Sequence, residues 1–456
     1  MLFNSLEFVI FFALVIPLYA VLRGHWALRK TFLLACSYLF YMAWNPPYVL
    51  LLVFSTFLDF TAGNQIAKSS RRSVRVGWMT VSLIGNLGVL AFFKYSDFLL
   101  SSIWPIMPAS AVYPPWVANI ILPMGISFYT FQSLSYTIDV YRDKSLRATS
   151  FLDFAVYVSF FPQLVAGPII RSREFLPQLT EEHSASSEDI LLGMDQMFRG
   201  FFKKVVLADT LAVYVDVVYA APEQFGSGNH VLAIYAYAFQ IYFDFSGYSD
   251  IAIGTARILG FRVPCNFNLP YLAAGPSDFW QRWHISLSTW LRDYLYISLG
   301  GSRATKFKTN RNLFITMLLG GLWHGAAWNF VMWGAFHGFW LGIHRVLFRD
   351  RELFKVNRYL SIFLTFHLVC LAWIFFRAQN IETITTVLSG FTNFERPFYL
   401  VTPDVLIALA IGFTSHLLGA STKLQRIWDN SFFAIKGSWY AFIIIAIFFF
   451  TKTTAS

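Results

Sequence analysis

One histidine lies within an apolar run that offers little other chemistry. His324 occurs in the segment 318–329, Leu-Leu-Gly-Gly-Leu-Trp-His-Gly-Ala-Ala-Trp-Asn. Ionisable residues at membrane depth are costly, so each one is a candidate functional group. A neutral imidazole can accept a proton from a hydroxyl near pH 7, which is the task of a general base in acyl transfer. Two GxxxG pairs, Gly321 with Gly325 and Gly334 with Gly338, support an alternative to catalysis equally well. In that alternative the segment is a helix-packing face and His324 is a hydrogen-bonded residue within it.

A second histidine occurs in a segment that mixes charged and aromatic residues. Residues 278–294 read Asp-Phe-Trp-Gln-Arg-Trp-His-Ile-Ser-Leu-Ser-Thr-Trp-Leu-Arg-Asp-Tyr and contain His284. On one continuous helix, the residues Phe279, Trp283, Ser286 and Trp290 would form a single stripe. This periodicity favours an interfacial amphipathic helix with its aromatic side chains at the level of the lipid headgroups.

The remaining titratable residues give weaker predictions. Asp244 and Asp250 could orient a catalytic histidine, but pairing with an arginine such as Arg257 or Arg282 is the commoner fate. Asp293 receives no role. His337 and His344 share a helix face without a third ligand at suitable spacing, and no metal site is expected. The three cysteines, Cys36, Cys265 and Cys370, show neither the CxxC spacing of a redox pair nor the Cys/His spacing of a zinc site. The other histidines are expected in loops or interfaces: His25, His183, His230, His367 and His416.

The composition places these residues in a membrane protein. Of 456 residues, 56% are hydrophobic and only 13% are charged, about half the charged share of a soluble domain. The formal charge of +10 comes from short loops between apolar runs, as the positive-inside rule produces, so we expect a lipid bilayer and no nucleic acid as partner. The apolar runs are continuous rather than alternating, which argues against a β-barrel.

Hydropathy predicts an all-α polytopic protein with a single domain over residues 1–456. The expected spans are 5–22, 31–44, 47–62, 76–94, 151–170, 230–257, 358–376, 402–420 and 436–451. Polar residues interrupt 116–141 and 189–220, and 311–346 holds two shorter segments that meet near His324 and Ala327. Such short segments imply re-entrant helices.

Basic loops predict the orientation. The segments around Arg29 and Lys68, and the stretches 142–144, 303–311, 345–358 and 423–436, are expected in the cytoplasm. Residues 95–121 contain no Lys or Arg and are expected outside. The first basic residue, Arg23, follows the first apolar run, which indicates an uncleaved span with its N-terminus outside. No Walker, GxGxxG, HExxH or GxSxG motif supports an ATPase, nicotinamide enzyme, zinc protease or serine hydrolase.

Residues 278–301 and 311–338 resemble the membrane-bound O-acyltransferase family, in the bacterial branch that O-acetylates exopolysaccharides such as alginate. Further similar stretches are 122–142, 161–171, 200–212 and 242–254, and the signature core runs over 122–338. The resemblance implies a ring of about ten to twelve transmembrane and re-entrant helices around a thin core with a through-tunnel. It also implies that His324 is the essential histidine and His284 the second one.

The resemblance further implies acetyl transfer from a cytoplasmic donor, with acetyl-CoA as donor substrate and no bound cofactor or metal. His324 would be the general base, and the tunnel candidates are Trp283, Trp323, Asn329 and Asp250. The expected partner is a periplasmic or membrane-anchored acetyl-accepting protein, and the expected location is the bacterial inner membrane. Two alternatives stay open: D-alanyl transfer to teichoic acid, and a non-enzymatic transporter with His324 lining its path.

Overall fold

The computed structural model describes residues 1, 3–108, 112–165, 167–303, 305–348, 357–399, 401–421, 423, 427 and 433–453. Within these ranges every regular element is helical, and no strand occurs. The all-α prediction is therefore confirmed. Parts of the expected basic loops 303–311, 345–358 and 423–436 lie outside the described residues.

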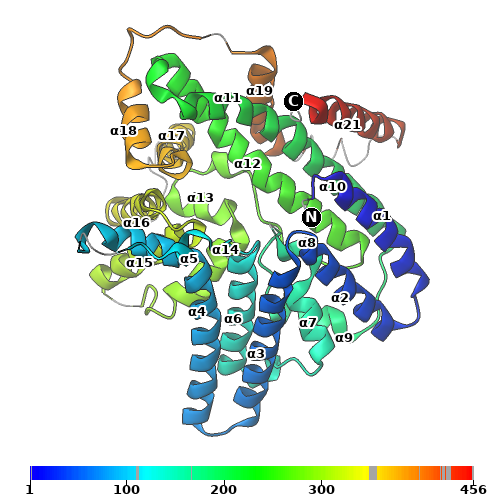
Figure 1. The fold of residues 1–456 in the computed structure, drawn as a ribbon. Helices are drawn as coiled ribbons and strands as arrows, with labels where there is room; N and C mark the ends of the chain where they lie inside the picture. The colour runs from blue at the N-terminus through cyan, green and yellow to red at the C-terminus, as the bar shows by residue number, and fades with distance from the viewer. Residues whose placement is uncertain are drawn as a thin grey trace. The chain divides into compact units, whose positions relative to one another are not determined.

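The chain divides into two compact units, residues 1–194 with 252–264, and residues 195–251 with 265–456 (Figure 1). We describe each unit by itself, and the expectation of one domain over 1–456 stays a prediction. The first unit contains α1 Leu6–Val21, α2 Trp26–Met42, η1 Pro46–Tyr48, α3 Val49–Lys68, α4 Arg72–Ile103, η2 Trp104–Ile106, α5 Pro115–Ala118, α6 Ile126–Arg142, η3 Lys144–Leu146, α7 Phe151–Ser159, α8 Phe161–Leu164 and α9 Ser172–Thr180.

Two long helices, α10 Ser187–Phe201 and α12 Ser227–Ile258, contribute residues to both units. The second unit otherwise contains η4 Phe202–Ala208, α11 Asp209–Ala220, η5 Pro222–Gln224, η6 Pro270–Leu272, α13 Pro276–Arg282, α14 Ile285–Trp290, η7 Leu291–Tyr296, α15 Lys306–His324, α16 Trp328–Phe348, α17 Arg358–Arg377, α18 Ile381–Gly390, α19 Pro403–Gly419 and α21 Phe433–Thr453.

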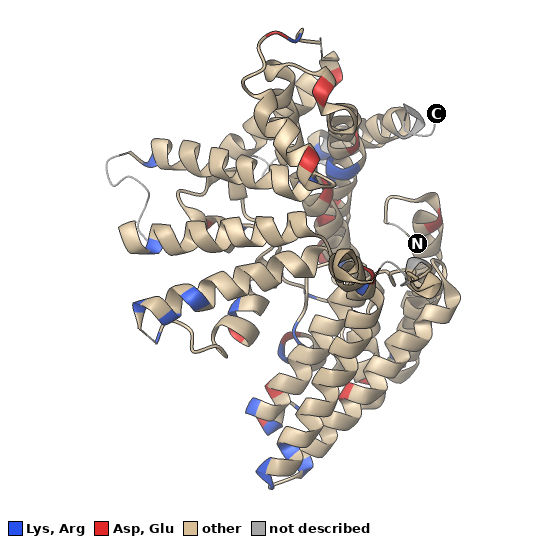
Figure 2. Cartoon of the chain, turned by 60° about the vertical axis from the view of Figure 1, so that its left-hand side comes forward, with Lys and Arg blue, Asp and Glu red and all other residues tan. Residues whose placement is uncertain are grey.

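Several helices have the length and composition of membrane spans. Among the described residues, Pro46–Lys68, Arg72–Ile106 and Arg358–Arg377 are long and apolar enough to cross a bilayer, and three shorter apolar helices are Leu6–Val21, Pro403–Gly419 and Ile435–Phe450. Basic residues gather at the turn between α3 and α4 (Figure 2). Large apolar side chains such as Leu50, Phe57 and Ile84 are exposed on the spanning helices, as a lipid-facing surface requires.

The expected span 151–170 is wrong as a single helix. Helix α7 ends at Ser159, Phe160 leaves the helical conformation, and α8 is only four residues long. Pro162 has no N–H to donate to the carbonyl of Val158, so an α-helix cannot continue regularly through this point. The polar stretch 189–220 behaves differently, because the π-helical segment η4 joins α10 to α11 and accommodates Lys203 and Lys204.

Candidate active site

Helices α15 and α16 form the hairpin that positions His324. Helix α15 ends at His324, and α16 begins at Trp328, so the break falls where hydropathy predicts it. The helices approach closely because a Cβ at Gly321 would meet the Phe330 carbonyl, and one at Gly334 would meet the Met317 carbonyl. The packing interpretation of these glycines is therefore correct, and the packing holds the histidine at the helix end.

Aromatic side chains enclose the half-buried imidazole of His324. Ring centroids lie 5.0 Å away for Trp323, 5.1 Å for Trp333 and 5.1 Å for Phe376. Trp333 comes from α16 and Phe376 from α17, so three helices contribute to the enclosure. Sequence reasoning missed Trp333 and Phe376. The short spacing from His324 to Trp333 across the hairpin turn is a signal that could have found the first of them.

His284 lies at a break between two short helices, so the prediction of one continuous amphipathic helix is wrong. Helix α13 ends at Arg282, Trp283 is extended, and His284 has φ of 43° and ψ of 54°. The expected placement of the aromatic stripe at headgroup level is also wrong, because Phe279 and Trp283 are buried. His284 itself is only 1% exposed.

Hydrogen bonds from a distant segment explain this break. Asn266 accepts the N–H of Ile285 at its main-chain oxygen (3.0 Å) and the N–H of Ser286 at Oδ1 (3.2 Å). Its Oδ1 also accepts the Ser286 hydroxyl at 2.9 Å. Asn266 thus satisfies the first N–H groups of α14, which otherwise lack partners at a helix start. The fold needs Asn266 here, and no local pattern in 278–294 reveals it.

The structure brings the two predicted histidines together. Their ring centroids are 6.3 Å apart with an interplanar angle of 56°, and Trp323 lies 5.9 Å from His284. Phe245 of α12 contacts the other side of His284 at 4.5 Å. Both ring nitrogens of His284 are buried and make no hydrogen bond to the described residues. Two imidazoles at this separation can contact one small reacting group.

The other tunnel candidates separate into different environments. Trp283 packs against Phe267 at 5.0 Å and Trp373 at 4.9 Å, within the buried aromatic core. Asn329 is buried at the start of α16, where its amide donates to the Ala378 carbonyl at 2.8 Å. This bond ties the hairpin to the end of α17.

The carboxylates pair with lysines rather than with the predicted arginines. Asp250 accepts from Lys203 at 2.6 Å, and Asp244 pairs with Lys204 at 2.7 Å. Arg257 pairs with Asp189 (3.1 Å), Arg282 with Asp278 (2.6 Å) and Arg292 with Asp293 (2.7 Å). The prediction of Arg257 or Arg282 as partner is wrong, because the π-helical segment η4 presents two successive lysines to α12.

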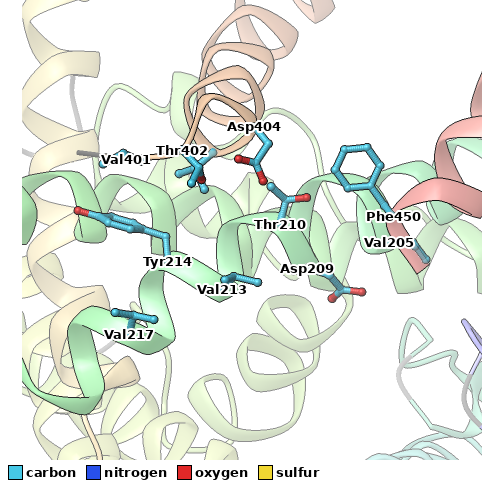
Figure 3. A pocket seen from close by; sticks show the side chains of 11 residues that line it. Val205, Asp209, Thr210, Val213, Tyr214, Val217, Val401, Thr402, Asp404 and Phe450 are labelled. Atoms are coloured by element: carbon cyan, nitrogen blue, oxygen red, sulfur yellow. The ribbon is translucent and has the colours of Figure 1, made fainter. Parts of the chain in front are cut away.

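Other features of the second unit are not ligands or partners that the sequence predicted for the histidine pair. In the described ranges, no three His, Cys, Asp or Glu side chains are placed to hold a metal ion. His337 packs between Trp280 and Trp333, at 5.1 and 4.8 Å. A pocket of about 390 Å³ is lined by α11, α19 and α21 residues, among them Thr210, Asp404 and Phe450, and contains neither histidine in its lining (Figure 3).

The structure thus places the two histidines together in an aromatic enclosure within a helical membrane protein. Residues 130–385 match the membrane-bound O-acyltransferase family, and the chain belongs to this family. It is therefore an acyltransferase.

Three relatives indicate its place within the family. The chain is 42% identical over 396 residues to the probable alginate O-acetylase AlgI of Azotobacter vinelandii, covering 86% of this chain and 78% of the relative. It is 36% identical to the peptidoglycan O-acetyltransferase of Helicobacter pylori, covering 79% and 73%. It is 30% identical to the teichoic acid D-alanyltransferase of Bacillus subtilis, covering 61% and 74%.

Proposed function

We propose that this chain is a membrane O-acetyltransferase that supplies acetyl groups for the O-acetylation of an exopolysaccharide such as alginate. The similarity to the Azotobacter alginate O-acetylase over most of both chains supports the substrate class. The observation that carries the chemistry is the approach of His284 and His324, 6.3 Å apart, at the turn of a glycine-packed hairpin.

In the proposed reaction, His324 takes the proton of the acceptor hydroxyl as its oxygen attacks the acetyl carbonyl carbon. A C–O bond forms, the C–S bond of the acetyl donor breaks, and the departing thiolate receives the proton from His324. His284 donates to the oxygen that becomes negative in the tetrahedral intermediate, if it carries its proton on the facing nitrogen. The rings of Trp323, Trp333 and Phe376 keep water from the donor.

We propose acetyl-CoA as the donor on the cytoplasmic side and no resident cofactor or metal. In this proposal the enzyme lies in the bacterial inner membrane with its N-terminus outside, and a through-tunnel inside a ring of helices connects donor and acceptor. A periplasmic or membrane-anchored protein accepts the acetyl group and modifies the polymer. Trp323 and Asn329 are proposed to line the donor path beside the histidines, and Trp283 to support His284 from behind.

D-alanyl transfer to teichoic acid is the second candidate, because the Bacillus relative carries that name and matches 61% of this chain. The two reactions differ in the donor. Purified protein that releases free CoA from acetyl-CoA only when an acceptor is added supports acetylation. It also argues against a transporter, which would release no CoA.

The decisive experiment compares polymer O-acetylation in cells that carry wild-type, His324→Ala or His284→Ala protein, with membrane abundance measured by immunoblot. We expect acetylation to vanish in His324→Ala and to fall at least about 100-fold in His284→Ala, the scale of losing a general base or an oxyanion donor. The control is His367→Ala. His367 also lies on a helix of the second unit, α17, but its ring hydrogen-bonds Tyr235 (2.8 Å) and has no part in the proposed reaction. Wild-type acetylation in His324→Ala would contradict the proposal.

A further inference from the structure

A pocket in the second unit combines an apolar wall with acidic side chains. It has a volume of about 390 Å³, within the range of small-molecule sites in proteins, and lies between α11, α19 and α21 (Figure 3). Five of its eleven lining residues are valines, and Phe450 of α21 adds an aromatic ring. Val213 and Val217 of α11 are 60% and 54% exposed, and residues 403–419 and 435–450 form apolar helices. The apolar wall therefore belongs to a surface that lipid chains cover.

The acidic part of the lining contains an unpaired carboxylate. Asp404 lies in the first turn of α19, is exposed, and forms no hydrogen bond or ion pair through its side chain with the described residues. Asp209 of α11 lines the same pocket and pairs with Lys204 at 2.7 Å. Lys204 also pairs with Asp244 at 2.7 Å, so one ammonium group faces two carboxylates. None of the described lining residues is Lys, Arg or His, and the pocket therefore carries a net negative charge.

The hydroxyl groups of α11 in the lining have already committed their hydrogens. The Thr210 hydroxyl donates to the Val206 carbonyl at 2.6 Å, and the Tyr214 hydroxyl donates to the Asn229 carbonyl at 3.3 Å. These oxygens therefore offer lone pairs to a ligand, and the Asp404 carboxylate offers only acceptors as well. A ligand that suits this lining brings N–H donors and a positive charge.

The place of Asp404 on α19 fits the level of lipid headgroups. An apolar helix occupies the hydrocarbon core, so a charged residue in its first turn lies where the hydrocarbon ends. Thr402 precedes α19 without a side-chain cap hydrogen bond, which leaves the first N–H groups of the helix open to an anion. A carboxylate and a helix start at the same place complement a headgroup that has one positive and one negative group.

We propose that this pocket binds the headgroup of a phospholipid that ends in a primary ammonium, as phosphatidylethanolamine does. The ammonium group donates to the Asp404 carboxylate, and the lipid phosphate lies at the first N–H groups of α19. The acyl chains run along the exposed valines of α11. The site is lined by residues other than the two histidines, and this inference does not depend on the proposed acetyl transfer.

Lipid retention by the full-length protein in detergent tests the proposal. Native mass spectrometry counts the bound lipids after addition of dioleoyl phosphatidylethanolamine, phosphatidylcholine or phosphatidylglycerol at equal mole fraction. The wild-type protein retains phosphatidylethanolamine best, because the choline group has no N–H to donate and the glycerol headgroup has no cation. The same lipid raises the Tm most, since a ligand that binds only the folded state stabilises it.

Asp404→Asn keeps the size of the side chain and removes its charge. Its half-saturating phosphatidylethanolamine concentration rises about tenfold, the scale of losing a hydrogen bond to a charged group. Glu382→Gln is the matched control, because Glu382 is an exposed carboxylate in the first turn of α18 and does not line the pocket. This control keeps the wild-type lipid preference, which separates lipid binding from the effect of a charge at a helix start.

Val213→Phe provides the second variant, because it places a ring in the apolar part of the pocket. The exposed position leaves room for the ring, so the Tm without added lipid equals the wild-type value while phosphatidylethanolamine retention falls several-fold. Val346→Phe, at an exposed position of α16 outside the pocket, keeps wild-type retention.

Three results would overturn the proposal. The first is equal retention of the three lipids by the wild-type protein, or a preference for phosphatidylglycerol. The second is an unchanged preference for phosphatidylethanolamine in Asp404→Asn, which places the ammonium group elsewhere. The third is a protein-sized adduct formed in cells by a photo-reactive residue at position 217, which assigns the pocket to a protein partner instead of a lipid.

Discussion

His284 is one of two described non-glycine residues with a positive φ, the other being Leu269. A side chain in the left-handed region destabilises the backbone by about 1–2 kcal/mol, and such strain persists where surrounding contacts hold it. Here the hydrogen bonds that the N–H groups of Ile285 and Ser286 donate to Asn266 hold it. The strained backbone places the imidazole beside His324, which a continuous helix through 284 would not do.

We predict that His284→Gly is more stable than His284→Ala by about 1 kcal/mol, because glycine adopts a φ of 43° without strain. Both variants lose the ring, so their difference isolates the backbone. Thermal unfolding of the two purified proteins measures it. Ser288 lies inside α14, and there the order should reverse, with Ala more stable than Gly. If His284→Ala and His284→Gly were equally stable, the backbone at position 284 would not be strained.

At the scale of elements, a line of glycines lets α15 and α16 pack closely. A Cβ at Gly334 would meet the Met317 carbonyl and Leu318, and one at Gly338 would meet Phe314. Backbone atoms cannot move aside as a flexible side chain can. If these glycines are replaced by residues with a side chain, the two helices of the hairpin must therefore move apart. His324 at the end of α15 then shifts with them.

We predict that Gly334→Ala lowers the stability by about 1–3 kcal/mol, as overpacking typically does, and reduces acetylation. Gly342→Ala on the same helix is the matched control, since a Cβ there meets nothing within 4 Å. That variant should be as stable as wild type or slightly more so, because alanine favours helix. Thermal unfolding and polymer acetylation are measured for both. Equal behaviour of the two variants would show that the hairpin does not need its close approach.

At the scale of the whole molecule, the distribution of charge predicts the orientation in the membrane. The turn between α3 and α4 is basic, whereas residues 95–121 carry neither Lys nor Arg. We predict that a cysteine at position 70 reacts with a membrane-impermeant maleimide only after the inner membrane is opened. A cysteine at position 106, where Ile106 is 85% exposed, should react in intact cells with a permeable outer envelope.

Both cysteines are introduced into protein without Cys36, Cys265 and Cys370, because Cys265 is exposed and would react itself. Mass shift on a denaturing gel reports the labelling. The reverse pattern would place the basic turn outside and contradict the proposed cytoplasmic donor side.

The amino-acid sequence by itself determined the membrane class, the helical secondary structure and the break near His324, whereas the roles of His324 and His284 stay predictions. These features depend on local composition: a spanning helix needs a run of apolar residues, and a hairpin turn needs a local interruption. The expected count of spans and the through-tunnel stay predictions, as does the single domain.

Only the tertiary structure decided three other features. The break at His284 depends on Asn266, which lies 18 residues earlier in the chain. The choice of Lys203 and Lys204 as partners of Asp250 and Asp244 depends on a π-helical segment. The side chains that donate to Asp59 of α3 come from α4 (Ser82 and Asn86) and α6 (Thr137), and Thr137 is 78 residues away in the chain. In each case the deciding hydrogen bond or ion pair joins residues that no local periodicity connects, so folding alone brings them together.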